Sequence, residues 1–278
     1  MRRLFGTLTI VLLAAGVGIA QGRDDHNDKA PLKSGYAVIT PAGGTGLVVF
    51  ETFGWRRGGD AGTPQAGVPA PDLTTNAVLF VDSKGKLSKN LGIAIVNPNP
   101  SNTNVSMTLR GSDGKKLGTK TVNVPSHQQI VSFFTELYAD QPSVPRDVTG
   151  TVAITSAGSS TLPVSVIGLR FRGTNFSTVP VTNLSGNVGP LPTIGNGGGP
   201  GAVLLPQFVV GGGWASEIVM VNTGTLNLTV RVDLFNGNGS PLSATFNGQT
   251  ASSFTNLSIP AGGVVTLAPR DPNGDDDF

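Results

Sequence analysis

The fold of this chain is decided by two stretches, Val105-Ser106-Met107-Thr108-Leu109-Arg110 and Leu228-Thr229-Val230-Arg231-Val232-Asp233-Leu234. Both alternate apolar and polar side chains, which is the pattern of a β-strand with one face on a core and the other in water. Each is followed by turn residues, Gly111-Ser112-Asp113-Gly114 and Asn236-Gly237-Asn238-Gly239. Asp-Gly and Asn-Gly supply the positive φ angles of tight hairpins. We therefore predict an all-β protein.

The two stretches are copies of one repeat, separated by 125 positions in the sequence. Other segments keep the same offset, and one further match follows an insertion of about ten residues in the second copy. Several elements with one offset indicate an internal duplication. The matching pairs are Ala77-Val78-Leu79 with Ala202-Val203-Leu204, Val96-Asn97 with Val221-Asn222, and Val122-Asn123-Val124-Pro125 with Leu257-Ser258-Ile259-Pro260.

The first copy continues into strands that the second copy lacks, and similar strands occur at the other end of the chain. The segment from Gly35 to Gly43 resembles the segment from Gly150 to Gly158, with Gly, Ile, Thr, Ala and Gly in register. Leu47-Val48-Val49-Phe50 matches the apolar strand near Val164, and Val68-Pro69 corresponds to Val179-Pro180. The chain is therefore interpreted as the tail of one repeat, a whole repeat and the head of another.

This phase shift predicts how the domains are divided. Residues 73–184 form a complete sandwich, residues 185–201 a Gly/Pro-rich linker, and residues 202–278 the first part of a second repeat. Residues 35–72 are predicted to complete 202–278, because half a sandwich leaves an apolar face and open strand edges. Closure occurs either within one chain, giving two domains, or head to tail between chains. The alternative is a piece of a longer repeat array.

The repeat resembles the immunoglobulin-like repeats of large secreted bacterial proteins over most of 36–278. The residues that carry the resemblance are Leu91-Gly92-Ile93-Ala94-Ile95-Val96-Asn97-Pro98, Pro206 to Trp214, and Ile218 to Asn222. The resemblance implies two antiparallel β-sandwiches, each of about seven strands. It implies little about function, because such modules serve as spacers, adhesins and carbohydrate binders.

The N-terminus has the layout of a secretory signal peptide. Met1-Arg2-Arg3 precedes an apolar run from Leu8 to Ala20, and a polar leader follows at residues 21–34. The run is shorter than the ~20 residues that a membrane span needs. We expect cleavage near Ala20, a secreted, periplasmic or cell-surface protein, and no membrane span after cleavage. The absence of cysteine (Cys 0) means that an exported fold of this kind is held by packing alone.

Charge argues against nucleic acid as a partner. The chain has 19 Lys and Arg against 17 Asp and Glu, and two of the bases, Arg2 and Arg3, lie in the signal peptide. The remaining chain is balanced, whereas nucleic-acid binding needs a clustered basic face. We expect a protein or glycan surface as partner, or self-association by strand exchange.

No catalytic site is predicted, so we expect a non-enzymatic structural or interaction module. His26 and His127 are the two histidines, and His127 lies in a predicted turn. Neither a Gly-x-Ser-x-Gly elbow nor a His-Glu-x-x-His motif is present. The three glutamates, Glu51, Glu136 and Glu217, fall on separate elements, which argues against the paired acids of a glycosidase.

Two weaker ligand sites come from the residue types that calcium and sugars prefer. Asp271, Asn273, Asp275 and Asp277 have the alternate spacing of oxygen ligands in a calcium loop, although Asp276 stands where the EF-hand pattern has Gly. A solvated acidic tail is the alternative. Trp55 and Trp214 are candidate platforms for sugar rings in a carbohydrate-binding or adhesive protein. The alternative is that each plugs the end of a core.

Overall fold

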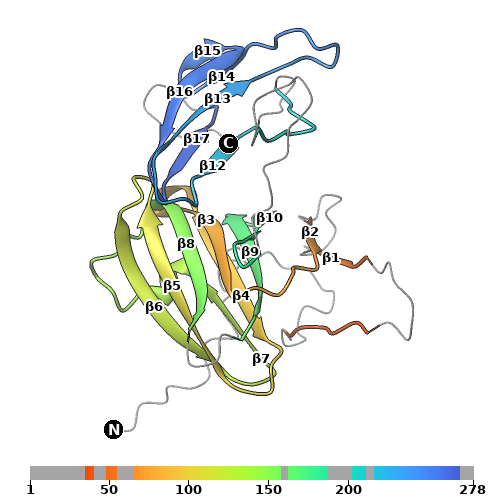
Figure 1. Cartoon of the computed structure of the whole chain (residues 1–278), viewed down its shortest axis with the longest axis vertical. Coiled ribbons are helices and arrows are strands. Elements are labelled where there is room, and N and C mark those ends of the chain that lie inside the picture. The colour runs from red at the N-terminus through yellow and green to blue at the C-terminus, as the bar shows by residue number, and fades with distance from the viewer. Residues whose placement is uncertain are drawn as a thin grey trace, which may run out of the picture. The chain divides into compact units, whose positions relative to one another are not determined.

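The computed structural model describes residues 35–40, 48–54, 65–157, 162–186, 202–210 and 216–269. The described residues divide into two compact units, unit 1 with strands β1 to β11 and unit 2 with strands β12 to β17 (Figure 1). Apart from a 3-10 turn, η1 (Gly85–Leu87), and one helical turn, α2 (Phe134–Leu137), the regular elements are antiparallel strands. The predicted all-β fold class is confirmed.

Unit 1 contains a two-layered sandwich. One layer has the strand order β10-β9-β4-β7, and the other has the order β11-β3-β8-β5-β6. The strands are β3 (Asn76–Ser83), β4 (Lys89–Asn97), β5 (Thr103–Gly111), β6 (Lys116–Val124), β7 (Gln128–Phe133), β8 (Val148–Ala157), β9 (Ser165–Arg172), β10 (Asn175–Val179) and β11 (Thr182–Asn183).

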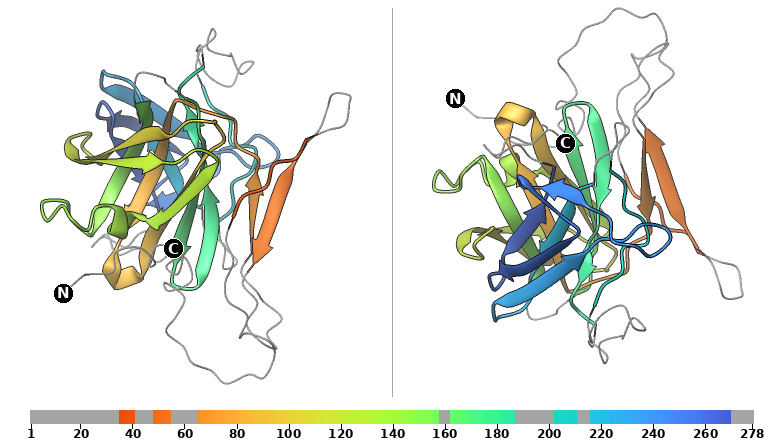
Figure 2. Two further views of the ribbon diagram at one scale, coloured as in Figure 1. Left: turned by 90° about the horizontal axis from the view of Figure 1, so that it is seen from below. Right: turned by 90° about the horizontal axis from the view of Figure 1, so that it is seen from above.

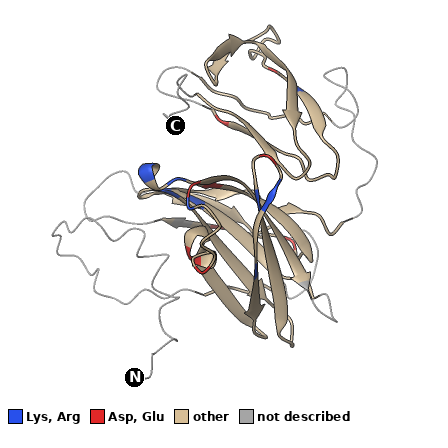
Figure 3. Cartoon of the chain, turned by 90° about the vertical axis from the view of Figure 1, so that its left-hand side faces the viewer, with Lys and Arg blue, Asp and Glu red and all other residues tan. Residues whose placement is uncertain are grey.

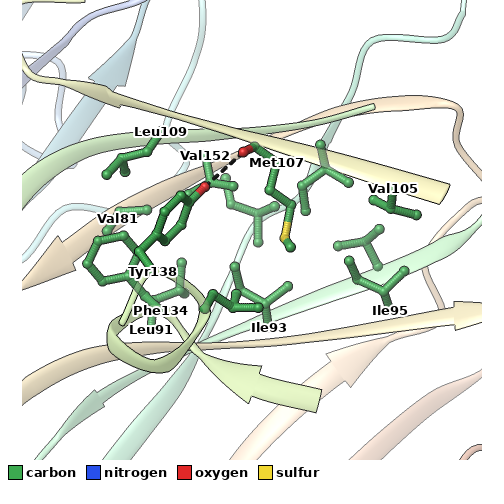
Figure 4. Packing of buried hydrophobic residues seen from close by; sticks show 14 of the residues in the cluster. Val81, Leu91, Ile93, Ile95, Val105, Met107, Leu109, Phe134, Tyr138 and Val152 are labelled. Carbon is green, nitrogen blue, oxygen red and sulfur yellow. Dashed lines mark hydrogen bonds between the residues drawn. The ribbon is translucent and has the colours of Figure 1, made fainter. Parts of the chain in front are cut away.

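The core of unit 1 is made by the inward-facing residues of both layers (Figure 4). Val105, Met107 and Leu109 of β5 are fully buried, as the alternation of that strand predicts. They face Ile93 and Ile95 of β4 in the opposite layer, so each sheet covers the apolar face of the other. Each such side chain stabilises the unit by roughly 1.5–3 kcal/mol relative to an exposed position.

The described residues of unit 2 form three pairs of strands. They are β12 (Ile218–Val221) with β17 (Val264–Leu267), β13 (Leu228–Asp233) with β16 (Ser253–Ile259), and β14 (Ala244–Phe246) with β15 (Gln249–Ala251). A smaller core joins them, in which Phe246 packs against Phe208 and Phe254 with ring centroids 5.8 and 5.4 Å apart. The β14–β15 hairpin is the insertion that the sequence places in the second copy.

The N-terminal strands lie against unit 1, which differs from their predicted position in the second sandwich. β1 (Phe50–Gly54) pairs with β2 (Gln65–Pro69), and β2 contacts β10, as both views of Figure 2 show. Thr178 Oγ1 donates to the carbonyl oxygen of Gly67 at 2.6 Å, and Val68 is buried against Phe133 and Leu169. The alternation of apolar residues predicts that the Val68 side chain is buried, but it does not predict which part of the protein buries it. Closure between chains stays a prediction.

Candidate interaction surface

One buried asparagine in each unit shows that the two copies share their detailed geometry. Asn97 Nδ2 donates to the carbonyl oxygens of Ser101 at 2.8 Å and Val124 at 3.0 Å. In unit 2, Asn222 Nδ2 donates to Leu226 at 2.8 Å and Ile259 at 3.0 Å, and Asn222 is the counterpart of Asn97. In each unit one of the two hydrogen bonds, to Val124 or to Ile259, is buried, so the asparagine satisfies a carbonyl oxygen inside the fold. The copies therefore share contacts as well as sequence.

The strand registers of the two units match as well. Val96 lies opposite Gln129 in unit 1, and its counterpart Val221 lies opposite Val264 in unit 2. The β5–β6 and β13–β16 pairs match as far as Val230: Val105 lies opposite Val122, and its counterpart Val230 lies opposite Leu257. Between Val230 and Val232 the β13–β16 register shifts, whereas β5–β6 shifts later, between Leu109 and Arg110. β4–β7 is therefore equivalent to β12–β17, and β5–β6 to β13–β16.

The copies differ in the number of neighbours that these strands have. β5 lies between β6 and β8, and β4 lies between β7 and β9. Among the described residues of unit 2, β13 pairs with β16 alone, and β12 with β17 alone. In unit 1, one side of β5 pairs with β8. We call the corresponding side of β13 the open edge.

The open edge leaves apolar side chains partly in water. Val105 is 0 % exposed in unit 1, whereas its counterpart Val230 is only half-buried, as is Val232. Leu79 of β3 is 1 % exposed because β3 pairs with β8. Its counterpart Leu204 is 68 % exposed and belongs to no strand. Among the described residues of unit 2, β13 thus lacks the second strand neighbour that β5 has in unit 1.

The described part of the chain does not include the ligand residues that the sequence predicted. Asp271, Asn273, Asp275 and Asp277, the calcium candidates, and Trp55 and Trp214, the sugar-binding candidates, all lie outside it. Within the described ranges, no group of three or more His, Asp or Glu residues is placed to hold a metal ion. The calcium and sugar sites stay predictions.

Two of the acid–base candidates have structural roles. The Glu136 carboxylate accepts from the backbone N–H of Phe133 at 3.0 Å and from Ser132 Oγ at 3.2 Å, so it caps the helical turn α2. His127 lies in an exposed turn with φ 52° and accepts a hydrogen bond from Tyr36 Oη through its backbone oxygen at 3.0 Å. Neither contact forms a nucleophile–base pair.

A buried ionic cluster in unit 1 was not predicted from the sequence. Lys89 Nζ lies 2.9 Å from Asp82 Oδ2, and Arg170 lies 3.3 Å from the same oxygen. The Lys89 and Asp82 side chains are 1 % and 7 % exposed and that of Arg170 is 20 % exposed, so the lysine and the carboxylate are buried and only the arginine reaches the surface. The cluster joins β3, β4 and β9, which lie in two different layers. The sequence signal was an acid and a base on either side of η1, which is too common to single out.

A hollow of about 420 Å³ lies beside α2, lined by residues that include Tyr138, Gln141 and Arg146. Burial raises the pKa of Tyr138 above its ordinary value, and its hydroxyl donates to the carbonyl oxygen of Met107 at 2.9 Å (Figure 4). Tyr138 therefore fixes α2 to β5 and does not titrate near neutral pH.

Figure 3 shows that most of the described ribbon carries neither basic nor acidic residues. These features leave the open edge as the candidate interaction surface.

Two solved structures have partial similarity to this chain. No protein-family model matches the sequence, and no curated protein matches it. The Anabaena sensory rhodopsin transducer is similar at 19 % identity and a TM-score of 0.30, over 35 % of this chain and 97 % of that one. Thermotoga maritima 1070 is similar at 14 % identity and a TM-score of 0.30, over 41 % of this chain and 98 % of that one. The immunoglobulin-like surface-protein family is not shown by these matches. No helix in the described ranges is long and apolar enough to cross a membrane.

Proposed function

We propose that this protein is an exported, non-enzymatic interaction module of immunoglobulin-like type, and that its binding element is the open edge of unit 2. The observation that supports the proposal is the difference between β5, with a strand on each side, and β13, with one strand partner among the described residues. An unpaired edge presents a row of backbone N–H and C=O groups that a further strand can join. Strand addition of this kind is a common mode of peptide recognition.

The side chains at the open edge support strand addition over flat surface contact. Val230 and Val232 alternate with Thr229 and Arg231, so an incoming strand would bury the first pair and leave the second in water. Burial of apolar area contributes about 25 cal/mol per Å², which favours a partner with apolar residues at alternate positions. The signal-peptide pattern supports an export route and a location in the secreted, periplasmic or cell-surface space.

The sharpest test of this function uses the strand that fills the equivalent place in unit 1. A synthetic peptide with the β8 sequence, Val148–Ala157, is titrated into the purified protein. We expect saturable binding, with amide hydrogen exchange of residues 228–233 slowed about tenfold and that of β5 unchanged. The matched control is the same peptide with Val152→Lys and Ile154→Lys, the two residues that are buried in unit 1.

The control peptide is expected not to bind, because lysine ammonium groups would enter the core. Exchange at residues 228–233 that is already as slow as in β5, with no response to the β8 peptide, would show that the edge is covered and would contradict the proposal.

A further inference from the structure

The N-terminal segment at residues 35–40 has the sequence of the strand that unit 2 lacks. Gly35, Ile39 and Thr40 are identical to Gly150, Ile154 and Thr155, at an offset of 115 positions. Gly150, Ile154 and Thr155 belong to β8, which lies between β3 and β5 in unit 1. The sequence match therefore concerns a strand with a defined place in the sandwich.

The β8 residues show what such a strand does when it is in place. Ile154 is 1 % exposed and lies opposite Met107 of β5 and Ala77 of β3. Val152 is fully buried and lies opposite Leu109 and Leu79. The strand pairs with two neighbours at once, so without it each of them has one edge with no strand partner.

Within the described part of the chain, residues 35–40 pair with no strand. The segment belongs to no strand, and the side chains of Val38 and Ile39 are 75 % and 57 % exposed. Tyr36 Oη donates to the backbone oxygen of His127 in unit 1, and Val68 of the following hairpin is buried in unit 1. An apolar segment of six residues, a usual strand length, is thus held at unit 1 without a sheet to join.

We propose that residues 35–40 of one copy insert as the missing strand at the open edge of unit 2 of a second copy. The inference rests on the function proposed above and names the partner. Transfer of the β8 register by 125 positions places Ile39 opposite Val232 and Ala202, and Ala37 opposite Leu234 and Leu204. The donor and acceptor surfaces lie on different units, so the contact is head to tail and generates fibres or closed rings.

The test uses engineered cysteines, because the chain contains none of its own (Cys 0). Thr40 and Arg231 lie opposite each other in the proposed register, since Thr155 lies opposite Ser106 in unit 1. Cα atoms in opposed antiparallel positions are about 4.5–5.5 Å apart, which a disulfide spans. Separately purified Thr40→Cys and Arg231→Cys full-length proteins are mixed and oxidised, and the disulfide dimer is measured on a non-reducing gel.

Two control variants define the background and the register. Thr250→Cys places the cysteine on the exposed β15 strand, and Thr229→Cys moves it two residues along β13. We expect at least about fivefold more dimer from Thr40→Cys with Arg231→Cys than with either control, because diagonal positions are about 7–8 Å apart. Ile39→Lys changes a side chain that is already exposed, so the variant folds, and it is expected to abolish the dimer and sediment as a monomer.

Three outcomes would overturn the inference, and they differ from one another. A Thr40→Cys/Arg231→Cys double variant that cross-links as a monomer at every dilution would show closure within one chain. Absence of cross-linking while the β8 peptide still binds would show that the edge accepts strands from another partner. Absence of both cross-linking and peptide binding would overturn the proposed function itself.

Discussion

Unit 1 and unit 2 share four equivalent strands, in the same register except for a shift between Val230 and Val232, yet they bury the same positions to different extents. Asn97 and Asn222 make equivalent hydrogen bonds, and the β4–β7 and β12–β17 pairs align residue for residue. Leu79 is nonetheless buried, and Leu204 is exposed. The comparison teaches that a strand's local pattern sets which side chains face inward, while the presence of a neighbouring strand decides whether they leave water.

The units also differ in how their strands are tied together by charge. Asp82, Lys89 and Arg170 form a buried cluster in unit 1, and the counterpart of Asp82 in unit 2 is Gln207. A buried ion pair stabilises a fold only when both charges are present and hydrogen-bonded. Unit 1 therefore depends on a set of residues that the second copy does not repeat.

The largest effect is expected from breaking this cluster. Asp82→Ala removes the carboxylate from a lysine whose side chain is 1 % exposed, and should lower the free energy of unfolding of unit 1 by about 4 kcal/mol. The double variant Asp82→Ala/Lys89→Met should recover more than half of this loss, because no buried ammonium then remains at the site. Urea denaturation followed by segment-resolved hydrogen exchange measures both. A loss below about 1 kcal/mol for the single variant would show that the cluster is not sealed from water.

An intermediate effect is expected from a matched pair of valines. Val105→Ala should destabilise unit 1 by about 2 kcal/mol, because it leaves a cavity beside a fully buried position. Val230→Ala, at the same position of the repeat, should cost about 1 kcal/mol in unit 2, because the side chain is only half-buried. Addition of the β8 peptide should raise the second value toward the first. Equal costs without the peptide would contradict the difference in burial between β5 and β13.

The smallest effect is expected at an exposed ion pair that is confined to unit 1. The hydrogen bond from Lys120 holds the pKa of the Asp140 carboxyl below its ordinary value. A carboxyl with a lowered folded-state pKa contributes stability above its unfolded pKa of about 4, and that contribution is lost as the pH falls through the folded pKa. Asp140→Asn should therefore weaken unit 1 slightly at neutral pH and flatten its acid dependence below about pH 4. Thermal unfolding of both proteins between about pH 2 and 7 measures this difference, and identical acid profiles would exclude the pair as a contributor.

Much of the sandwich could be predicted from the sequence because its signals are local. The alternation around Met107 placed the inner face of β5, and the ten-residue insertion is the β14–β15 hairpin. The candidate surface was predicted in outline, since the phase of the repeat indicated missing strands. The buried cluster could not be predicted, because Asp82 and Arg170 are 88 positions apart and meet only when the layers stack.

The sequence by itself determined that this is an all-β protein with a duplicated half-sandwich, because period-two alternation and a constant offset are properties of the chain alone. The tertiary structure decided what each strand lies against. It placed Val68 on unit 1, left Leu204 exposed and gave β13 a single strand partner among the described residues. The physical reason is that sheet hydrogen bonds and apolar contacts join residues far apart in sequence, and an edge accepts any strand that presents compatible backbone and side chains.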